Sequence, residues 1–503
     1  MFAGDTSSPA SLVHQRHEFA TLLLRMEHFD VLIVGAGISG IGAAYHLQTE
    51  CPKRSYAILE GRAALGGTWD LFRYPGIRSD SDMYTLGFSF KPWKEQRAIA
   101  DGKAILSYLN ETVDEFGIRK NIRFSQHVRT ASWSSETSRW TLSVQTGETI
   151  TEYTCNFLFT CGGYYDYKEG YTPAFPGASA YKGTMVHPQQ WPADLDYSGK
   201  RVLVIGSGAT AVTLVPSLAK KAAHVTMLQR SPTYMMSRPS VDGIAEKIRR
   251  YLPEKAAYSA IRWKNVGVTM LFYNQSKSRP AAIAKFLINS VRKQLRPGYD
   301  VEKHFTPKYA PWDERVCLVP DGDLFDAINE GRASIATDHI ETFTETGIRL
   351  KSGESIDADI IVTATGLKLR LMGGIALRVD GREIDISESM MYKAMMFSDV
   401  PNLALWFGYT NASWTLKCDL TSEYMCRLLN HMDTHGYSQC VPQHDPSVQE
   451  RSFLPLTSGY IKRGRDGLPK QGDRAPWKLK QNYAFDIANI RYSDVDDGVM
   501  KFS

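Results

Sequence analysis

The sequence predicts an α/β protein in which two parallel-sheet units are joined in one chain, and three observations support this prediction. An apolar, mostly β-branched run at 30–34 leads directly into a glycine-rich stretch at 35–40, and a second apolar run follows at 56–59. The same order of features returns at 201–228. The chain has 503 residues, which is enough for two or more domains with their own cores. Each unit therefore has the order of a βαβ motif.

The first glycine-rich stretch has the spacing G-x-G-x-x-G. Gly35 permits a tight turn, Gly37 lets the backbone approach a pyrophosphate, and Gly40 lets the helix pack closely on the strand. The next strand ends at Glu60, about where a carboxylate binds the 2′-hydroxyl of a ribose. A glycine triplet alone can be an ordinary turn, but the flanking strands and the carboxylate favour a dinucleotide site.

The second glycine-rich stretch keeps Gly206 and Gly208 and has Ala211 in the third small position. Its following strand ends at Arg230, so an arginine stands where the first unit has an acidic residue. A guanidinium can pair bidentately with a 2′-phosphate, whereas a carboxylate favours a free 2′-hydroxyl. We therefore predict FAD in the first unit and NADPH, rather than NADH, in the second. The other interpretation of Arg230 is a solvated surface arginine.

Composition excludes several classes of protein. The net charge of +5 is modest for this length and gives no reason to expect a nucleic-acid partner. The seven cysteines are scattered without a C-x-x-C pair, which excludes a dithiol reductase with the same two fingerprints and favours a reducing cytoplasm. No apolar run approaches the roughly 20 residues that span a membrane. We predict no metal site, and we expect residues 1–25 to be a disordered extension.

A loop rich in Gly, Arg and aromatic residues follows the first unit. From Gly67 to Asp80 it reads G-x-W-x-x-x-x-Y-P-G-x-x-x-D, which resembles a signature of the class B flavoprotein monooxygenases of Baeyer–Villiger type. The stretch 181–192 resembles the linker motif of that family, F-x-G-x-x-x-H-x-x-x-W-P, with Tyr181 in place of Phe. The resemblance covers nearly all of 26–490.

The resemblance implies an activity and a set of site residues. It implies an NADPH- and O2-dependent conversion of ketones to esters or lactones through a C4a-peroxyflavin, with S-oxygenation of thioethers or thioamides as a side activity. Arg315 is similar in position to the arginine that stabilises the peroxide, and Asp80 would hold that arginine in place. Gly67, Thr68 and Trp69 would contact FAD. Many members of the family have a lysine before the arginine as a second 2′-phosphate ligand, but Glu314 stands here.

The resemblance also divides the chain. We expect an FAD-binding domain and an NADPH-binding domain, both Rossmann-like, with a helical insertion in the second. The expected boundaries are an extension at 1–25, FAD domain at 26–162, NADPH domain at 163–240, insertion at 241–306, NADPH domain again at 307–366, and FAD domain again at 367–503.

Three questions stay open at this point. An N- or S-oxygenating flavin monooxygenase of the same fold is the main alternative, and a non-catalytic, membrane-associated FAD-binding protein is a remote one. For His187, a structural or coupling role is favoured over a direct role in chemistry. Trp414 and Tyr409 fit a place in the core as well as a place in the substrate pocket. The physiological substrate and the oligomeric state do not follow from the sequence.

The segment 244–296 concentrates positive charge. It holds twelve Lys or Arg against two Glu, although the whole chain carries only +5. Apolar residues are interleaved with these charges at helical spacing. One interpretation is that the apolar faces pack on the NADPH domain and wall the substrate pocket. The other is a peripheral contact with an anionic membrane, because basic amphipathic helices with Trp and Phe lie on such surfaces.

Overall fold

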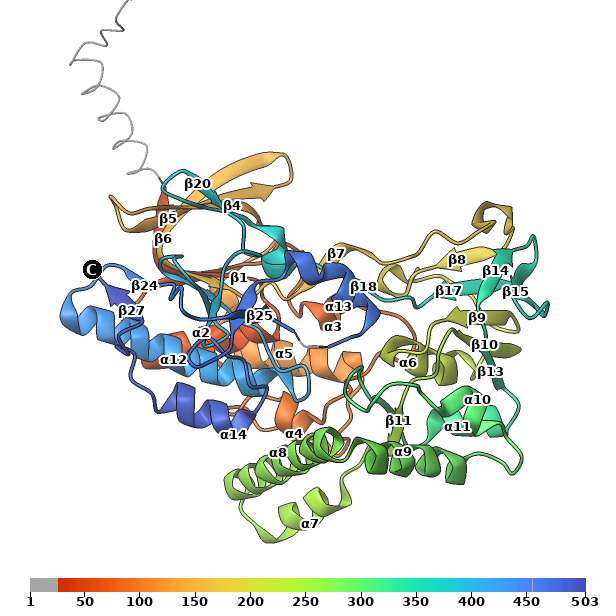
Figure 1. Cartoon of the computed structure of the whole chain (residues 1–503). Helices are drawn as coiled ribbons and strands as arrows, with labels where there is room; N and C mark the ends of the chain where they lie inside the picture. The colour runs from red at the N-terminus through yellow and green to blue at the C-terminus, as the bar shows by residue number, and fades with distance from the viewer. Residues whose placement is uncertain (1–25, 455) are drawn as a thin grey trace, which may run out of the picture.

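The computed structural model describes residues 26–454 and 456–503, so the expected extension at 1–25 lies outside the described residues. The predicted fold class is confirmed: two sheets lie side by side, each covered by helices, and three further helices lie beneath them (Figure 1). All seven cysteines are free and buried. No helix in the described part of the chain is long and apolar enough to cross a membrane.

The first sheet is built on the strand that precedes the first glycine turn. β1 (Glu27–Val34) pairs in parallel with β2 (Tyr56–Leu59) on one side and with β6 (Thr149–Thr160) on the other. β1 has both neighbours and its last four residues are largely buried, which explains why it has an unbroken apolar run instead of alternation. α2 (Ile38–Glu50) begins at the glycine turn.

The strands of this sheet follow the order β20-β19-β4-β5-β6-β1-β2-β3, with β23 paired to β6. The others are β3 (Ile122–Arg123), β4 (His127–Ser134), β5 (Arg139–Thr146), β19 (Ala376–Val379), β20 (Arg382–Ile384) and β23 (Leu403–Leu405). Helices α3 (Thr68–Leu71), α4 (Met83–Leu86) and α5 (Gly102–Glu115) follow β2 in the chain.

The second sheet repeats this plan in five parallel strands of order β13-β10-β9-β17-β8. They are β8 (Thr184–Val186), β9 (Arg201–Ile205), β10 (His224–Gln229), β13 (Ala333–Thr337) and β17 (Ile360–Thr363). α6 (Ala209–Leu218) begins at the second glycine turn, and α11 (Asp323–Asn329) precedes β13. A three-stranded antiparallel sheet, β14 (Ile340–Phe343), β15 (Gly347–Leu350) and β16 (Ser355–Asp357), leads into β17.

Two chain crossings connect the sheets. β7 (Tyr165–Gly170) leaves the end of β6 and pairs antiparallel with β18 (Leu367–Leu369), which leaves the end of β17. The two crossings therefore run beside each other between the two sheets, as Figure 1 shows. His187 lies beside them, where its Nε2–H donates to the carbonyl of Gly366 at 3.1 Å and its Nδ1 accepts from the backbone of Gln189. This position fits a coupling role for His187.

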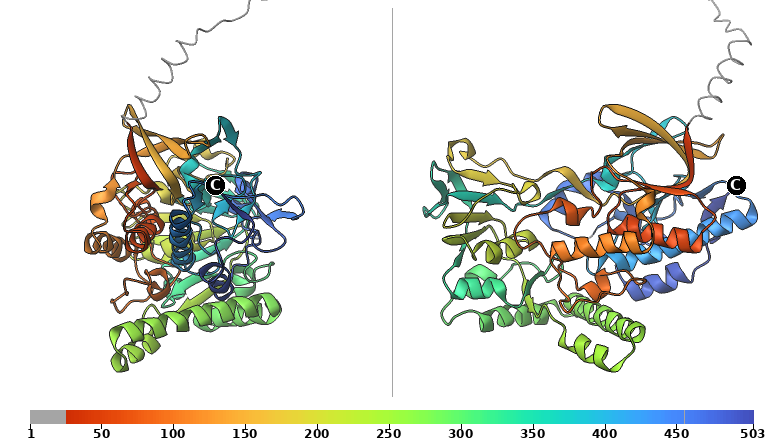
Figure 2. Two further views of the ribbon diagram at one scale, coloured as in Figure 1. Left: turned by 90° about the vertical axis from the view of Figure 1, so that its left-hand side faces the viewer. Right: turned by 180° about the vertical axis from the view of Figure 1, so that it is seen from behind.

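The basic segment forms α7 (Gly243–Tyr251), α8 (Glu254–Ser278) and α9 (Pro280–Gln294), which lie along one edge of the molecule (Figure 2). α8 packs against α4 of the first unit, and α9 packs against β11 (Met235–Arg238), which pairs with β12 (Cys317–Pro320). The buried guanidinium of Arg262 anchors α8, because it donates to the carbonyls of Tyr84, Thr85 and Gly87 and to Asp419.

The C-terminal part returns to the first sheet. α12 (Trp414–His435) lies against α2 and ends at Gly436, whose φ of 72° is the left-handed conformation typical of a helix C-cap. α13 (Gly459–Gly464) packs beside β18, and α14 (Tyr483–Asp486) packs against α12. Short two-stranded ribbons complete this region: β21 (Met391–Tyr392) with β22 (Met396–Phe397), β24 (Cys440–Pro442) with β27 (Met500–Phe502), and β25 (Glu450–Ser452) with β26 (Lys470–Gly472).

Candidate functional site

Main-chain atoms leave no room for a side chain at two positions of the first glycine turn. Gly35 has φ of 102°, and a Cβ there would come within 2.8 Å of the carbonyl oxygen of Cys161 at the end of β6. A Cβ on Gly40 would overlap the carbonyl oxygen of Gly35. Only glycine fits at these two positions, because the obstructing atoms belong to the main chain and cannot rotate away.

The loop of Gly67 is brought onto this turn. Gly67 has φ of 55°, and a Cβ on it would lie 3.2 Å from the Cα of Gly37. Two glycines from different segments therefore face each other, which leaves bare backbone where a pyrophosphate would approach. Thr68 and Trp69 begin α3 directly behind Gly67, and Trp69 is half-buried against the first core.

Glu60 lies at the end of β2 and is buried. Its two carboxylate oxygens accept hydrogen bonds from the backbone N–H of Ala36 at 2.7 Å and of Arg62 at 2.8 Å. Burial raises the pKa of this carboxyl, and the two backbone donors oppose the rise. A carboxylate has lone pairs left after two such bonds, so Glu60 can fix the glycine turn and still accept from a ribose hydroxyl.

The second glycine turn has the same backbone path but a more open surface. Gly206 has φ of 136°, and a Cβ there would overlap the carbonyl oxygen of Ala364 at the end of β17. A Cβ on Gly208 would meet nothing within 4 Å. Ala211, which replaces the third glycine, is fully buried in the second core. Arg230 is exposed one residue beyond β10 and has no ion-pair partner among the described residues.

Arg315 and Asp80 meet near the second turn, since the Sγ of Cys317, two residues beyond Arg315, lies 3.9 Å from the carbonyl oxygen of Ser207. The Nη1 of Arg315 lies 3.4 Å from Oδ2 of Asp80, although 235 positions separate them in the chain. The Nε of Arg315 is buried and has no hydrogen-bond partner in the described part of the chain. Asp80 therefore contacts one nitrogen of the guanidinium, and the N–H at Nε remains available as a hydrogen-bond donor.

Sequence reasoning missed three side chains on α13. Positive charge on Lys462, together with Arg230, opposes the rise in the pKa of Glu314 that burial causes, so both cations lie near this carboxylate. Arg463 stacks on the ring of Tyr171 at 3.5 Å from its centroid. The third side chain, Tyr460, lies on the same short helix. These residues belong to no recognisable sequence motif, because α13 lies close to Glu314 only after the chain has folded.

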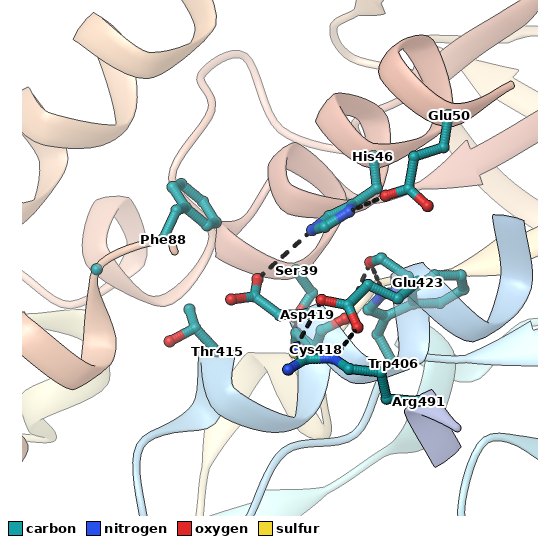
Figure 3. A network of polar contacts seen from close by, with 12 residues as sticks. Ser39, His46, Glu50, Phe88, Trp406, Thr415, Cys418, Asp419, Glu423 and Arg491 are labelled. Atoms are coloured by element: carbon teal, nitrogen blue, oxygen red, sulfur yellow. Dashed lines mark hydrogen bonds and ion pairs between the residues drawn. The ribbon is translucent and has the colours of Figure 1, made fainter. Parts of the chain in front are cut away.

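A buried polar network ties α2 to α12 (Figure 3). Nδ1 of His46 lies 2.6 Å from Glu50, and its Nε2 lies 3.8 Å from Asp419. Burial alone would lower the pKa of His46, but the nearby carboxylates of Asp419 and Glu50, the latter hydrogen-bonded to Nδ1, outweigh it and raise the pKa to about 9. Ser39, in the first turn of α2, contacts Cys418 at 3.4 Å. The His46–Asp419 contact thus adds an ionic link between α2 and α12 to the apolar packing of α2.

Trp414 is the first residue of α12, and Tyr409 lies in the loop before this helix. The indole N–H of Trp414 donates to Ser39 at 2.8 Å, and its ring stacks on Tyr164 with centroids 5.2 Å apart. Tyr409 is buried and donates to Asp486 at 2.7 Å. Tyr409 is therefore part of the core, whereas Trp414 lies at the first glycine turn.

A small pocket of about 20 Å³ lies beside these residues. Its walls come from α8, the loop before α12 and the residues before α14. Tyr273 on α8 lines this pocket and packs edge-on against Trp312, three positions before Arg315, with ring centroids 5.6 Å apart. The pocket is thus close to the Arg315 loop, and in this structure it has room for about one water molecule.

Comparisons with known proteins agree with this arrangement. The flavin-binding monooxygenase-like family model matches residues 86–372, and the NAD(P)-binding Rossmann-like domain model matches residues 33–97. The chain is 56% identical to the FAD-containing monooxygenase EthA of Mycobacterium tuberculosis, with 95% of this chain and 98% of that protein covered. It is 50% identical to the probable FAD-binding monooxygenase AlmA of Acinetobacter baylyi, with 95% and 96% covered.

Solved structures show the same fold. A steroid monooxygenase bound to NADP superposes with a TM-score of 0.74 at 23% identity, covering 94% of this chain and 99% of that one. An open crystal structure of cyclohexanone monooxygenase gives 0.73 at 21% identity, covering 95% and 100%.

Proposed function

The chain belongs to the flavin-binding monooxygenase-like family, and from this premise we propose that it is an FAD-containing, NADPH- and O2-dependent monooxygenase of Baeyer–Villiger type. Its substrates are small ketones, which it converts to esters or lactones, and organic sulfur compounds, which it oxygenates at sulfur. The observation that carries the proposal is the Arg315–Asp80 pair, in a chain that also has two glycine turns suited to two dinucleotides. The expected division into FAD domain, NADPH domain and helical insertion is part of this proposal.

The residues of the first turn fit FAD. Gly37 and Gly67 bring two backbone segments without side chains into close contact, and Glu60 retains acceptor capacity at the same turn. When bound, FAD supplies the oxygen-activating chemistry, and the protein supplies position, charge and exclusion of water. The residues of the second turn fit NADPH, because Gly208 leaves space and Arg230 has a free guanidinium for the 2′-phosphate.

Arg315 would act as a fixed positive charge. A guanidinium stays protonated in proteins, so it can hold negative charge that develops on oxygen without itself losing a proton. Asp80 accepts a hydrogen bond from Nη1 and so orients the guanidinium. Nε and Nη2 are not bound to Asp80.

One experiment tests the proposal. The enzyme is reduced with NADPH in the absence of oxygen, and ¹⁸O2 is then admitted with cyclohexanone or a thioether. We expect bleaching of the flavin by NADPH and a lactone that carries one ¹⁸O atom. Sulfoxide without lactone would favour the N- or S-oxygenating alternative, and failure of NADPH to reduce the flavin would contradict both.

The insertion supports a second proposal, peripheral contact with an anionic membrane. Seven of the eleven large apolar side chains exposed in the described residues lie on it: Ile244, Tyr251, Leu252, Trp263, Val268, Leu271 and Phe286. Five of its twelve cations are already held by protein groups, namely Arg249, Arg262, Lys264, Lys277 and Arg292. The remaining cations and these apolar side chains suit a surface of acidic lipid.

Sedimentation with phosphatidylserine vesicles tests this contact. Binding should be lost as salt rises, since screening weakens attraction between exposed charges. Trp263→Glu should abolish pelleting, whereas Tyr492→Glu, a change at an exposed aromatic outside the insertion, should not. Equal pelleting with neutral phosphatidylcholine vesicles, or no pelleting at low salt, would contradict the proposal.

A further inference from the structure

The segment 71–80 follows the first glycine turn in the sequence, but its apolar side chains belong to the second core. Phe72 and Tyr74 are buried members of that core, and Leu71 and Ile77 pack against it. Burial of apolar surface is the main attraction between such elements. The segment therefore leaves the first unit and is bound to the second.

The helix of the second glycine turn touches the middle of this segment. Gly76 has φ of 79°, and a Cβ on it would overlap the side chain of Ser217 on α6. The same Cβ would come within 3.1 Å of the carbonyl oxygen of Thr213. Glycine is needed here for the left-handed backbone and for the close approach. The segment thus lies directly on α6.

Arg78 connects the two units through different parts of one residue. Its backbone forms an antiparallel bridge with Asp101, the N-cap of α5 in the first unit. Its guanidinium pairs with Asp323 in the first turn of α11, with Nη1 2.5 Å from Oδ2 and Nη2 3.3 Å from Oδ1. The side chains of Arg78 and Asp323 are only 15% and 29% exposed, so solvent screens this two-point contact incompletely.

Asp80 stands two residues beyond Arg78. Side chains two positions apart in extended backbone point to the same face. The partners of the two residues, Asp323 for Arg78 and Arg315 for Asp80, agree with this, because both belong to the second unit. The contact of Asp80 with Arg315 is long, at 3.4 Å, and Asp80 is half exposed, so this contact holds the segment only weakly. The position of Asp80 therefore depends on Arg78.

We propose that Arg78 is a positioning residue for oxygen transfer, because its ion pair with Asp323 fixes the segment that presents Asp80 to Arg315. The inference rests on the proposed function and deepens it. Arg78 acts through Asp80 and is not itself a catalytic residue. Without the ion pair Asp80 moves, and the guanidinium of Arg315 loses the acceptor that orients it. A misoriented charge slows oxygen transfer, although the nucleotide still binds.

Hydrogen exchange tests whether the ion pair holds the segment. Arg78→Met removes one charge and keeps a long side chain, and Asp323→Asn removes the other charge at constant size. Mass spectrometry follows the amides of 73–80 in the FAD-loaded protein without NADPH. Exchange should be about tenfold faster in both variants, because a charge-assisted contact is lost. Arg349→Met breaks an ion pair with Glu341 on the three-stranded sheet and is the matched control, which should leave 73–80 unchanged. Unchanged exchange in the first two variants would overturn the proposal.

Turnover tests whether the position of the segment matters for oxygen transfer. With NADPH, O2 and cyclohexanone, both variants should form about tenfold less lactone per NADPH consumed. The remaining NADPH and O2 should appear as NADP⁺ and hydrogen peroxide, and KM for NADPH should stay as in the wild type. The double variant should lose no more than either single variant, since both changes remove the same contact. Arg78→Lys, which keeps the charge, should fall between the wild type and Arg78→Met. Faster exchange with an unchanged lactone yield per NADPH would overturn the positioning role.

The outcomes separate this inference from the proposed function. Lactone formation by the wild type, with the same yield per NADPH in the variants, would reject the positioning role alone. A wild type that forms neither lactone nor sulfoxide would reject the proposed chemistry, and the exchange of 73–80 would then decide whether Arg78 holds the segment. FAD content and thermal unfolding identify a variant that fails to fold. If Arg78→Met does so, Arg78→Lys and Asp323→Asn decide by the same two measurements.

Discussion

The two glycine turns have the same backbone path and different surroundings. At the first turn, carbonyl oxygens of Gly35 and Cys161 exclude any side chain, and Glu60 is buried with two backbone donors. At the second turn, Gly208 faces open space, and Arg230 is exposed and has no ion-pair partner in the part of the chain that the structure describes. The difference suits a cofactor that stays bound at the first turn and a nucleotide that enters and leaves at the second.

The supports of the two helices differ in the same way. α2 packs through the fully buried Ile41, Ala44 and Leu47, and in addition the charged group of His46 and Glu50 on α2 faces Asp419 of α12, as Figure 3 shows. α6 is held by apolar side chains, since Val212, Leu214 and Val215 are fully buried in the second core. A change in the protonation of His46 should therefore affect the first turn more than the second.

The largest effect is expected from Gly40→Val. Its side chain would overlap the main chain of Gly35, so we expect folded protein to contain almost no FAD. The flavin-to-protein absorbance ratio of the purified variant measures this. The counterpart change at the second turn, Ala211→Gly, should cost no more than about 1 kcal/mol and leave FAD content and NADPH use in place. Normal FAD content in Gly40→Val would show that the first turn can accommodate a side chain at position 40.

Arg315→Ala probes the group that lies near the second turn. We expect normal FAD content and reduction of the flavin by NADPH, but a fall of roughly a hundredfold or more in lactone formation, because a positioned charge is lost. Single-turnover reduction and product yield separate the two steps. Asp80→Ala should be milder, since the pair is partly exposed and its role is orientation. If Asp80→Ala proves worse than Arg315→Ala, Asp80 has a direct role.

Much of this comparison could be predicted from the sequence, because a glycine turn with its flanking strands is a local pattern. The Arg315–Asp80 pair was predicted through motif resemblance, although 235 positions separate its members. The approach of Lys462 to Glu314 could not be predicted, nor could the hydrogen bond from Nδ2 of Asn411 to the carbonyl of Gln481 at 2.9 Å. Their contacts join distant segments, and an isolated Lys, Asn or Gln has no spacing that distinguishes it from a surface residue.

The network of His46 should make the FAD side sensitive to pH. Its folded-state pKa of about 9 is above the ordinary value of 6.5, so the stabilisation is fully present below about pH 6.5 and is lost as pH rises through 9. The shift corresponds to on the order of 3 kcal/mol. Urea-induced flavin release should therefore need less urea at pH 9.5 than at pH 6.5, and His46→Gln should remove most of that difference. If flavin release from His46→Gln depended on pH as in the wild type, a group other than His46 would be its cause.

The smallest effect, and the sharpest test of the second turn, concerns the 2′-phosphate. Arg230→Ala should raise KM for NADPH by about tenfold with little change for NADH, because one charge-assisted contact to phosphate is lost. Glu314→Lys should lower KM for NADPH, since it replaces a carboxylate near Arg230 and Lys462 with a cation. Lys462→Ala should resemble a weaker Arg230→Ala if α13 contributes to the same phosphate. Equal changes for NADPH and NADH in Arg230→Ala would leave Arg230 as a solvated surface arginine and remove the electrostatic contrast between the two turns.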